Sequence, residues 1–138
     1  MRSTIMLGGD AYTFEATAGT AELFQLFTGK NLMAEVYEIR EMSELIKKNP
    51  EEVSFEEYMK MFPVVDIFKR LAYVMNVQAK ADKSNPIESI RWTKEQLNDD
   101  AYFAWLMGME DQALSMGNLM QISNLWTSQI KSNVEAKN

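Results

Sequence analysis

The chain contains no cysteine and no histidine among its 138 residues. The first absence excludes disulfides, thiolate metal ligands and a cysteine nucleophile. The second removes the side chain whose ordinary pKa lies nearest neutral pH, which is also the commonest metal ligand and general base. Most hydrolase triads and the usual zinc sites are therefore excluded. Because only carboxylates and lysines remain for catalysis, the composition argues against an enzyme and predicts neither a cofactor nor a metal.

Basic clusters and long apolar runs are also scarce. The formal net charge is −6, and the local basic clusters are two pairs, Lys47-Lys48 and Lys69-Arg70, each beside acids. Nucleic-acid-binding proteins normally present a basic surface, so direct binding of DNA or RNA is disfavoured. No stretch approaches the roughly 18 apolar residues of a membrane span. The segment from Met1 to Leu7 lacks the pattern of a signal peptide. We therefore expect a cytoplasmic protein with no membrane partner.

The remaining composition is that of an ordinary globular protein. Apolar residues make up 46% of the chain and charged residues 25%, a balance far from that of a disordered segment. A chain of this length buries roughly two-thirds of its unfolded surface in one core. No linker or repeat divides the sequence. We expect residues 1–130 to form a single globular domain and the polar residues 131–138 to form a flexible C-terminal tail.

The first residues predict a β-hairpin. Ser3 to Leu7 is a short apolar and β-branched run, and Ala11 to Ala16 alternates apolar and polar side chains. Between these runs lies Gly8-Gly9-Asp10, and glycine allows the positive φ that a tight hairpin turn demands. No P-loop lysine and hydroxyl follow the two glycines, so they indicate a turn rather than a phosphate site. A lone hairpin is marginally stable, so it must pack on the rest of the chain.

Helix signals fill the rest of the sequence. The first helix is capped by Thr17 and runs to Thr28, where Gly29 stops it, and the second runs from Asn31 to Asn49. A capping box at Ser54 begins the next helix, which bends near Pro63 and continues as an apolar stripe to Ala79. Asn85-Pro86 caps a further short helix, and a second capping box covers Thr93 to Gln96. The last third is helical and rich in Met and Trp, with weak points at Gly108 and Gly117. The predicted fold class is α+β, mostly α, with an N-terminal β-hairpin packed on a bundle of about five helices.

Adjacent acids could be offered as metal ligands. Examples are the pairs Glu51-Glu52, Asp99-Asp100 and Glu110-Asp111. A Ca²⁺ site needs several oxygens around a tight loop, and the glycine-punctuated acidic pattern of an EF-hand is absent. Asp99-Asp100 stands where a helix begins, and acids there interact favourably with the helix dipole. We therefore interpret the pairs as solvated or capping residues and predict no metal site.

The chain has eleven methionines, whose flexible side chains suit surfaces that accept varied partners. A helical methionine stripe is nevertheless more often core, and we expect Met75 and Met107 to be core residues. Met109, Met116 and Met120 lie in a segment that is apolar over more than one helix face, so their pattern fits a core and a protein interface equally. Trp126 has two readings, either an anchor for a partner or a pin that holds the last helix to the domain. These four residues are the candidate protein-binding site.

Taken in order, these features resemble the tail assembly chaperones of long-tailed phages and prophages of Gram-positive bacteria. The resemblance spans nearly the whole chain, although each motif is short and degenerate. The motifs are the hairpin Thr4 to Ala16, the turn Phe27-Thr28-Gly29-Lys30-Asn31-Leu32, the helical run Leu71-Ala72-Tyr73-Val74-Met75 followed by Gln78-Ala79, the segment Ile122-Ser123-Asn124-Leu125-Trp126, and the polar Lys131-Ser132-Asn133. The departure is the acidic balance of this chain, because many relatives end in a more basic tail.

The resemblance implies a non-enzymatic role in phage tail assembly. Members of the family are made in a short form and in a longer, frameshifted form. They coat the tape measure protein, recruit the major tail protein before the tail polymerises, and are absent from the finished virion. The resemblance therefore implies tape measure protein and major tail protein as partners, self-association of the chaperone, and action in the host cytoplasm. The motif positions have no catalytic role in the family.

Two alternatives share this composition. A small acidic regulator that occupies a host protein has the same size and the same lack of catalytic groups. A chaperone gene lies between the genes for a major tail protein and a very long, helical tape measure, so gene neighbourhood separates these two functions. The third reading is an enzyme that uses carboxylates alone. It requires a concave pocket with two acids in unequal environments.

Overall fold

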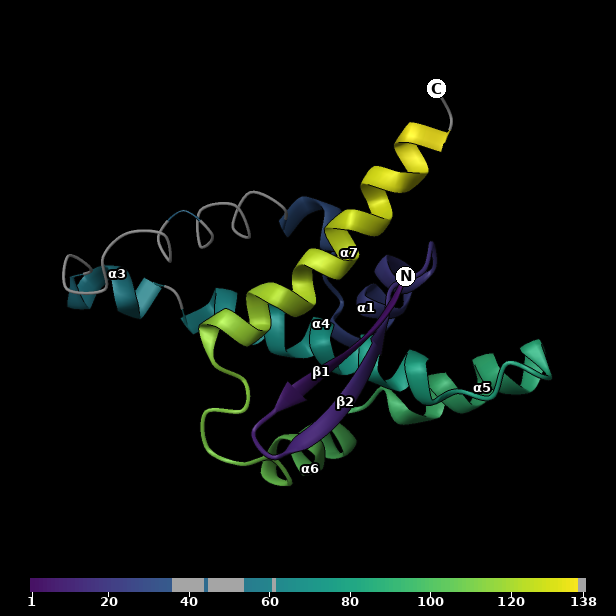
Figure 1. Cartoon of the computed structure of the whole chain (residues 1–138), viewed down its shortest axis with the longest axis horizontal. Helices are drawn as coiled ribbons and strands as arrows, with labels where there is room; N and C mark the ends of the chain where they lie inside the picture. The colour runs from purple at the N-terminus through teal and green to yellow at the C-terminus, as the bar shows by residue number, and fades with distance from the viewer. Residues whose placement is uncertain (36–43, 45–53, 61, 137–138) are drawn as a thin grey trace.

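The computed structural model describes residues 1–35, 44, 54–60 and 62–136. Its elements are β1 (Arg2–Leu7), β2 (Asp10–Glu15), α1 (Thr20–Thr28), the 3₁₀ turn η1 (Leu32–Glu35), α3 (Phe55–Lys60), α4 (Phe62–Lys80), α5 (Pro86–Gln96), α6 (Asp99–Met107) and α7 (Met116–Ala136) (Figure 1). The predicted class, a mostly helical α+β protein with an N-terminal hairpin, is confirmed. Most of the helix predicted from Asn31 to Asn49 lies outside the described residues, as do Lys47-Lys48 and Glu51-Glu52.

The hairpin forms where the sequence predicts it. β1 and β2 pair antiparallel, with Leu7 opposite Asp10 across the two glycines. Gly8 has a φ of 67°, which favours glycine because it lacks a Cβ. A Cβ added to Gly8 would lie 2.6 Å from Oε2 of Glu110. The Gly9 N–H donates a hydrogen bond to the same oxygen at 3.2 Å, so Glu110 ties the turn to the segment between α6 and α7.

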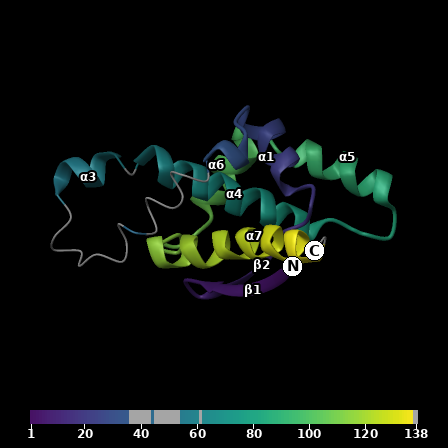
Figure 2. The same ribbon diagram turned by 90° about the horizontal axis from the view of Figure 1, so that it is seen from above.

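Helix α4 is the centre of the fold. It contacts β2, α1, α3, α5, α6 and α7, and Figure 2 shows the hairpin on one side of it and α1 and α6 on the other. Every residue from 71 to 79 is buried. The sequence predicts a single apolar stripe here, but a helix packed on all sides buries its whole circumference. Its polar members are therefore hydrogen-bonded: Gln78, for example, accepts from the Thr20 hydroxyl at 2.7 Å and donates to Thr17 Oγ1 at 3.0 Å.

Several helix ends follow their local signals. Gly29 closes α1 with a φ of 75°, and its N–H donates to the carbonyl of Gln25. The side chain of Asn85 accepts from the Glu88 N–H at the start of α5, with Pro86 in the first helical position. Ser54 Oγ accepts from the Glu57 N–H at 3.1 Å and caps α3. These predictions are confirmed. The sequence could make them because each depends on neighbours within one helical turn.

Other helix limits differ from the prediction. Thr17 does not cap α1, because Gly19 is the N-cap and Thr17 belongs to the hydrogen-bonded loop before it. No helix begins at Thr93, since α5 continues through it to Gln96, and Asn98 caps α6 instead. The last third forms two helices that are separated after Gly108. The second, α7, continues to Ala136, into the segment for which a flexible tail is expected.

Helices α3 and α5 extend from opposite ends of the molecule (Figures 1 and 2). Residues buried in the main core come from the hairpin, α1, η1, α4, the segment before α7, and α7; they include Leu7, Phe14, Phe24, Leu71, Leu119 and Trp126. A second cluster of Tyr73, Val77 and Tyr102 joins α4 to α6. The long-range packing is therefore concentrated around α4, and the ends carry more exposed apolar side chains.

Candidate functional site

The four predicted binding residues do not form one exposed patch. Trp126 is 2% exposed and belongs to the main core. The structure therefore places it in the second of its two roles, as a pin for α7. Met109, Met116 and Met120 are half-buried and pack against the outside of that core. Of the four residues, these three methionines present part of their side chains at the surface.

Met107, which we expect in the core, is 86% exposed. The expectation is wrong because α6 ends at Met107, before the chain turns at Gly108. The inner face of α6 is filled by larger aromatic side chains, chiefly Tyr102 and Trp105. Met75, in contrast, is fully buried in the core as expected.

Met116 lines a recess at the start of α7. The recess has a volume of about 410 Å³ and lies between the N-terminal part of α4 and the segment that precedes α7. Phe62 is 52% exposed, and Val65 and Leu114 are half-buried. We call this feature the Met116 recess; its lining consists of Phe62, Val65, Lys69, Gln112, Leu114, Ser115 and Met116. Sequence reasoning missed Phe62, because its exposure depends on where α4 begins relative to a segment 50 residues later in the chain.

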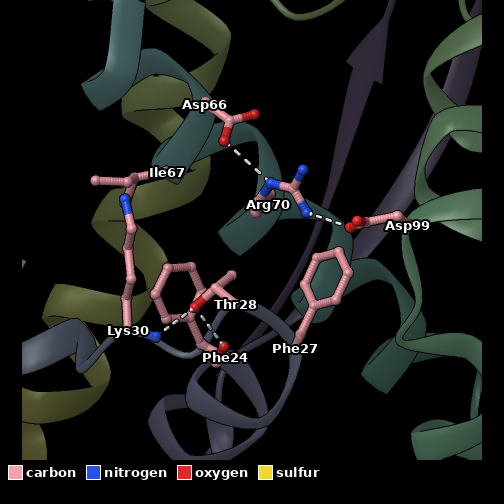
Figure 3. A pocket seen from close by; sticks show the side chains of 8 residues that line it. All are labelled: Phe24, Phe27, Thr28, Lys30, Asp66, Ile67, Arg70 and Asp99. Atoms are coloured by element: carbon pink, nitrogen blue, oxygen red, sulfur yellow. Dashed lines mark hydrogen bonds and ion pairs between the residues drawn. The ribbon is translucent and has the colours of Figure 1, made fainter.

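A second cavity, of about 290 Å³, surrounds Arg70 (Figure 3). The Arg70 guanidinium lies between two carboxylates, with Nε 3.0 Å from Asp66 Oδ2 and Nη1 2.8 Å from Asp99 Oδ1. Its central carbon is 4.5 Å from the ring centroid of Tyr102 and 5.1 Å from that of Phe27. We call these five residues the Arg70 clamp. The clamp joins α1, α4 and α6, and cation–π contacts of this kind are favourable.

The surroundings of the Arg70 clamp keep Arg70 charged and Tyr102 neutral. Burial alone lowers the pKa of Arg70, but the hydrogen bonds and charges of Asp99 and Asp66 outweigh this effect and raise the pKa above its ordinary value. Burial also raises the pKa of the Tyr102 phenol, and the nearby carboxylate of Asp66 adds to the rise. Tyr102 is therefore neutral throughout the physiological pH range.

The Arg70 clamp has the character of a structural tie. An enzyme that uses carboxylates alone requires two acids in unequal environments. Here Asp66 and Asp99 bind the same guanidinium, and their side chains are exposed to similar degrees, 55% and 65%. The nearby Thr28 hydroxyl donates to the Phe24 carbonyl at 2.8 Å. These contacts do not favour a nucleophile or an acid–base pair in this cavity.

In two of the acid pairs, one member has a structural partner. Asp99 binds Arg70 at the start of α6, and Glu110 binds the hairpin turn. Across residues 1–35, 54–60 and 62–136, no three or more carboxylates come together as they would to hold a metal ion. Among the helices described, none has both the length and the apolar character needed to span a membrane.

Comparison with protein-family models, with curated proteins and with solved structures found no match.

Proposed function

We propose that this chain is a non-enzymatic tail assembly chaperone, which binds the tape measure protein and recruits the major tail protein during assembly of a long phage tail. The observation that carries the proposal is the Met116 recess. It offers Phe62, Leu114 and Met116 at the surface of a chain that has neither histidine nor cysteine. A side chain of a helical partner fits a recess of this kind, because protein interfaces are built around buried apolar and aromatic anchors.

The motifs that carry the resemblance occupy positions that determine the fold. The run from Leu71 to Met75 is buried throughout and belongs to α4. Ile122 and Trp126, from the later motif, are buried in the same core. In this chain, therefore, these two motifs contribute mainly to the core. Partner contacts must use other residues, and the half-buried methionines around the start of α7 are suited to them.

Methionine fits the demands of this function. A chaperone for a long partner must bind it at successive, unequal positions and later release it. The unbranched thioether side chain adapts to irregular apolar surfaces, as in other promiscuous binding proteins. The net charge of −6 keeps the unbound protein soluble despite its exposed apolar side chains.

We expect the double substitution Met116→Ser and Met120→Ser to weaken capture of the tape measure protein by at least about tenfold in a pull-down, because it removes two apolar contacts worth roughly 1 kcal/mol each. Both side chains are half-buried. The variant must therefore be checked by far-UV circular dichroism and thermal unfolding, and it should remain helical.

The matched control is Met6→Ser, which changes a 59% exposed methionine that lies between the buried Ile5 and Leu7 on β1 and so faces away from the core. It should leave capture unchanged. Equal capture by the double variant and the wild type would remove this surface from the proposal. Capture of neither tape measure nor major tail protein by the wild type would instead favour the acidic regulator, a reading that gene neighbourhood then tests.

A further inference from the structure

Helix α5 presents an amphipathic face to solvent. Ile87 and Ile90 are 71% and 54% exposed, and neither belongs to a core cluster of the described residues. Arg91 and Lys94 are exposed on the same side, since positions i, i+3, i+4 and i+7 share one face of a helix. The helix packs on the fold through its other side, where Thr93 is its buried residue. We call Ile87, Ile90, Arg91 and Lys94 the basic face.

Helix α6 presents a face of opposite charge. Phe103 is 48% exposed and Met107 is 86% exposed, while Asp100 is exposed in the first turn. These residues stand at i, i+3 and i+7 along the helix, so they share one side. The opposite side packs inward through Tyr102, which is completely buried. We call Asp100, Phe103 and Met107 the acidic face.

The two faces match when the helices are placed antiparallel. Each spans seven residue steps, or about 10 Å at 1.5 Å per residue. In this arrangement Ile87 lies opposite Met107, Ile90 lies near Phe103, and Lys94 lies opposite Asp100. Both apolar halves meet, and the cation of the last turn of α5 meets the acid of the first turn of α6. The antiparallel helix dipoles are also favourably aligned.

We propose that the basic face of α5 binds the acidic face of α6 in a second copy of this chain. Within one copy the two faces do not meet, because each helix already uses its other side to pack on the fold, through Thr93 and Tyr102. The partner for each face is a second copy because Lys94 of one copy and Asp100 of the other carry opposite charges at matching positions. Arg91 pairs with Glu88 at 3.3 Å, but both side chains are more than 60% exposed. An exposed pair of this kind exchanges partners at little cost, so Arg91 remains available to the contact.

The proposal assigns two faces to the self-association that the resemblance implies, but it rests on the charges and exposure of α5 and α6, and its test needs only the purified chain. Sedimentation velocity or light scattering over a concentration series should show an average mass that rises above 15.9 kDa with concentration. Lys94→Glu alone and Asp100→Lys alone place like charges opposite each other. Each substitution should raise the midpoint, the concentration at which half of the chains are associated, by at least about tenfold.

The decisive sample is an equimolar mixture of the two variants. Glu at position 94 of one copy then faces Lys at position 100 of the other, so the mixture should associate more strongly than either variant alone. Matched controls are Lys60→Glu and Glu56→Lys, which make the same charge changes at exposed positions of α3 and should leave the midpoint unchanged. Far-UV circular dichroism identifies any variant that fails to fold, in which case Ile87→Ser combined with Ile90→Ser replaces it.

A wild-type mass that stays at the monomer value at every concentration would overturn the proposal. A mixture that associates no better than its components would also overturn it, because the contact would then lie elsewhere on the surface. Loss of association in the α3 controls to the same degree would assign the effect to net charge and would likewise contradict the pairing of these two faces.

Discussion

Replacing Trp126 with alanine lowers the free energy of unfolding by about 3–5 kcal/mol, the usual cost of truncating a large buried aromatic side chain. Trp126 is 2% exposed and lies in the main core on α7. The α7 helix contacts both α4 and β1. Because a domain of this size is stable by only about 5–15 kcal/mol in total, this single change removes a large part of its stability.

Chemical denaturation followed by circular dichroism measures the effect of Trp126→Ala. The matched control is Trp92→Ala, because Trp92 is 38% exposed on α5 and contributes less buried surface. We expect the control to cost less than about 1.5 kcal/mol, in keeping with partial burial. Equal losses in the two variants would mean that Trp126 does not pin α7 to the core.

Replacing Asn76 with leucine destabilises the fold by about 2–6 kcal/mol, since it leaves two polar groups without a partner at roughly 1–3 kcal/mol each. Asn76 is 2% exposed in the middle of α4. Its Nδ2 donates to the Thr13 carbonyl of the hairpin at 2.9 Å, and its Oδ1 accepts from Trp105 Nε1 of α6 at 3.1 Å. One amide thus connects three elements.

A double-mutant cycle with Trp105→Phe isolates one of these two hydrogen bonds, because phenylalanine lacks the indole donor. The two substitutions together should cost less than the sum of their separate effects. Asn124→Leu is the control: Asn124 is exposed on α7, and its change should stay within about 0.5 kcal/mol of the wild type. Strict additivity of Asn76→Leu and Trp105→Phe would contradict the hydrogen bond between them.

The sequence predicts the features of this fold that depend on near neighbours. The turn at Gly8-Gly9, the stop at Gly29 and the cap at Asn85 each require a particular backbone angle or a hydrogen bond within one helical turn. The break at Gly108 is harder to predict, because a glycine inside an apolar helical pattern indicates a weakened helix as well as an end. In the structure Gly108 caps the end of α6, Ser115 Oγ accepts from the Asn118 N–H at the start of α7, and Tyr102 and Leu119 pack in different core clusters.

The candidate sites depend on contacts between distant segments, and the sequence predicts them only in part. Met116 is singled out by its residue type, but its recess also needs Phe62, from the first residue of another helix. Arg70 reads in the sequence as half of a basic pair with Lys69. Its role as a clamp appears only when Asp99 and Phe27 approach it from other helices. For Trp126 the sequence identifies an important residue but not its role, because an aromatic residue near the end of the sequence fits a partner anchor and a core residue equally well.

The central claim is that this chain acts by placing apolar surface against a protein partner. Isothermal titration of the purified chain with a tape measure protein, the partner that we propose, repeated at several temperatures, tests this claim most directly. We predict saturable binding with a negative heat-capacity change, the signature of apolar surface removed from water. Absence of binding, or binding whose enthalpy does not change with temperature, would contradict the claim.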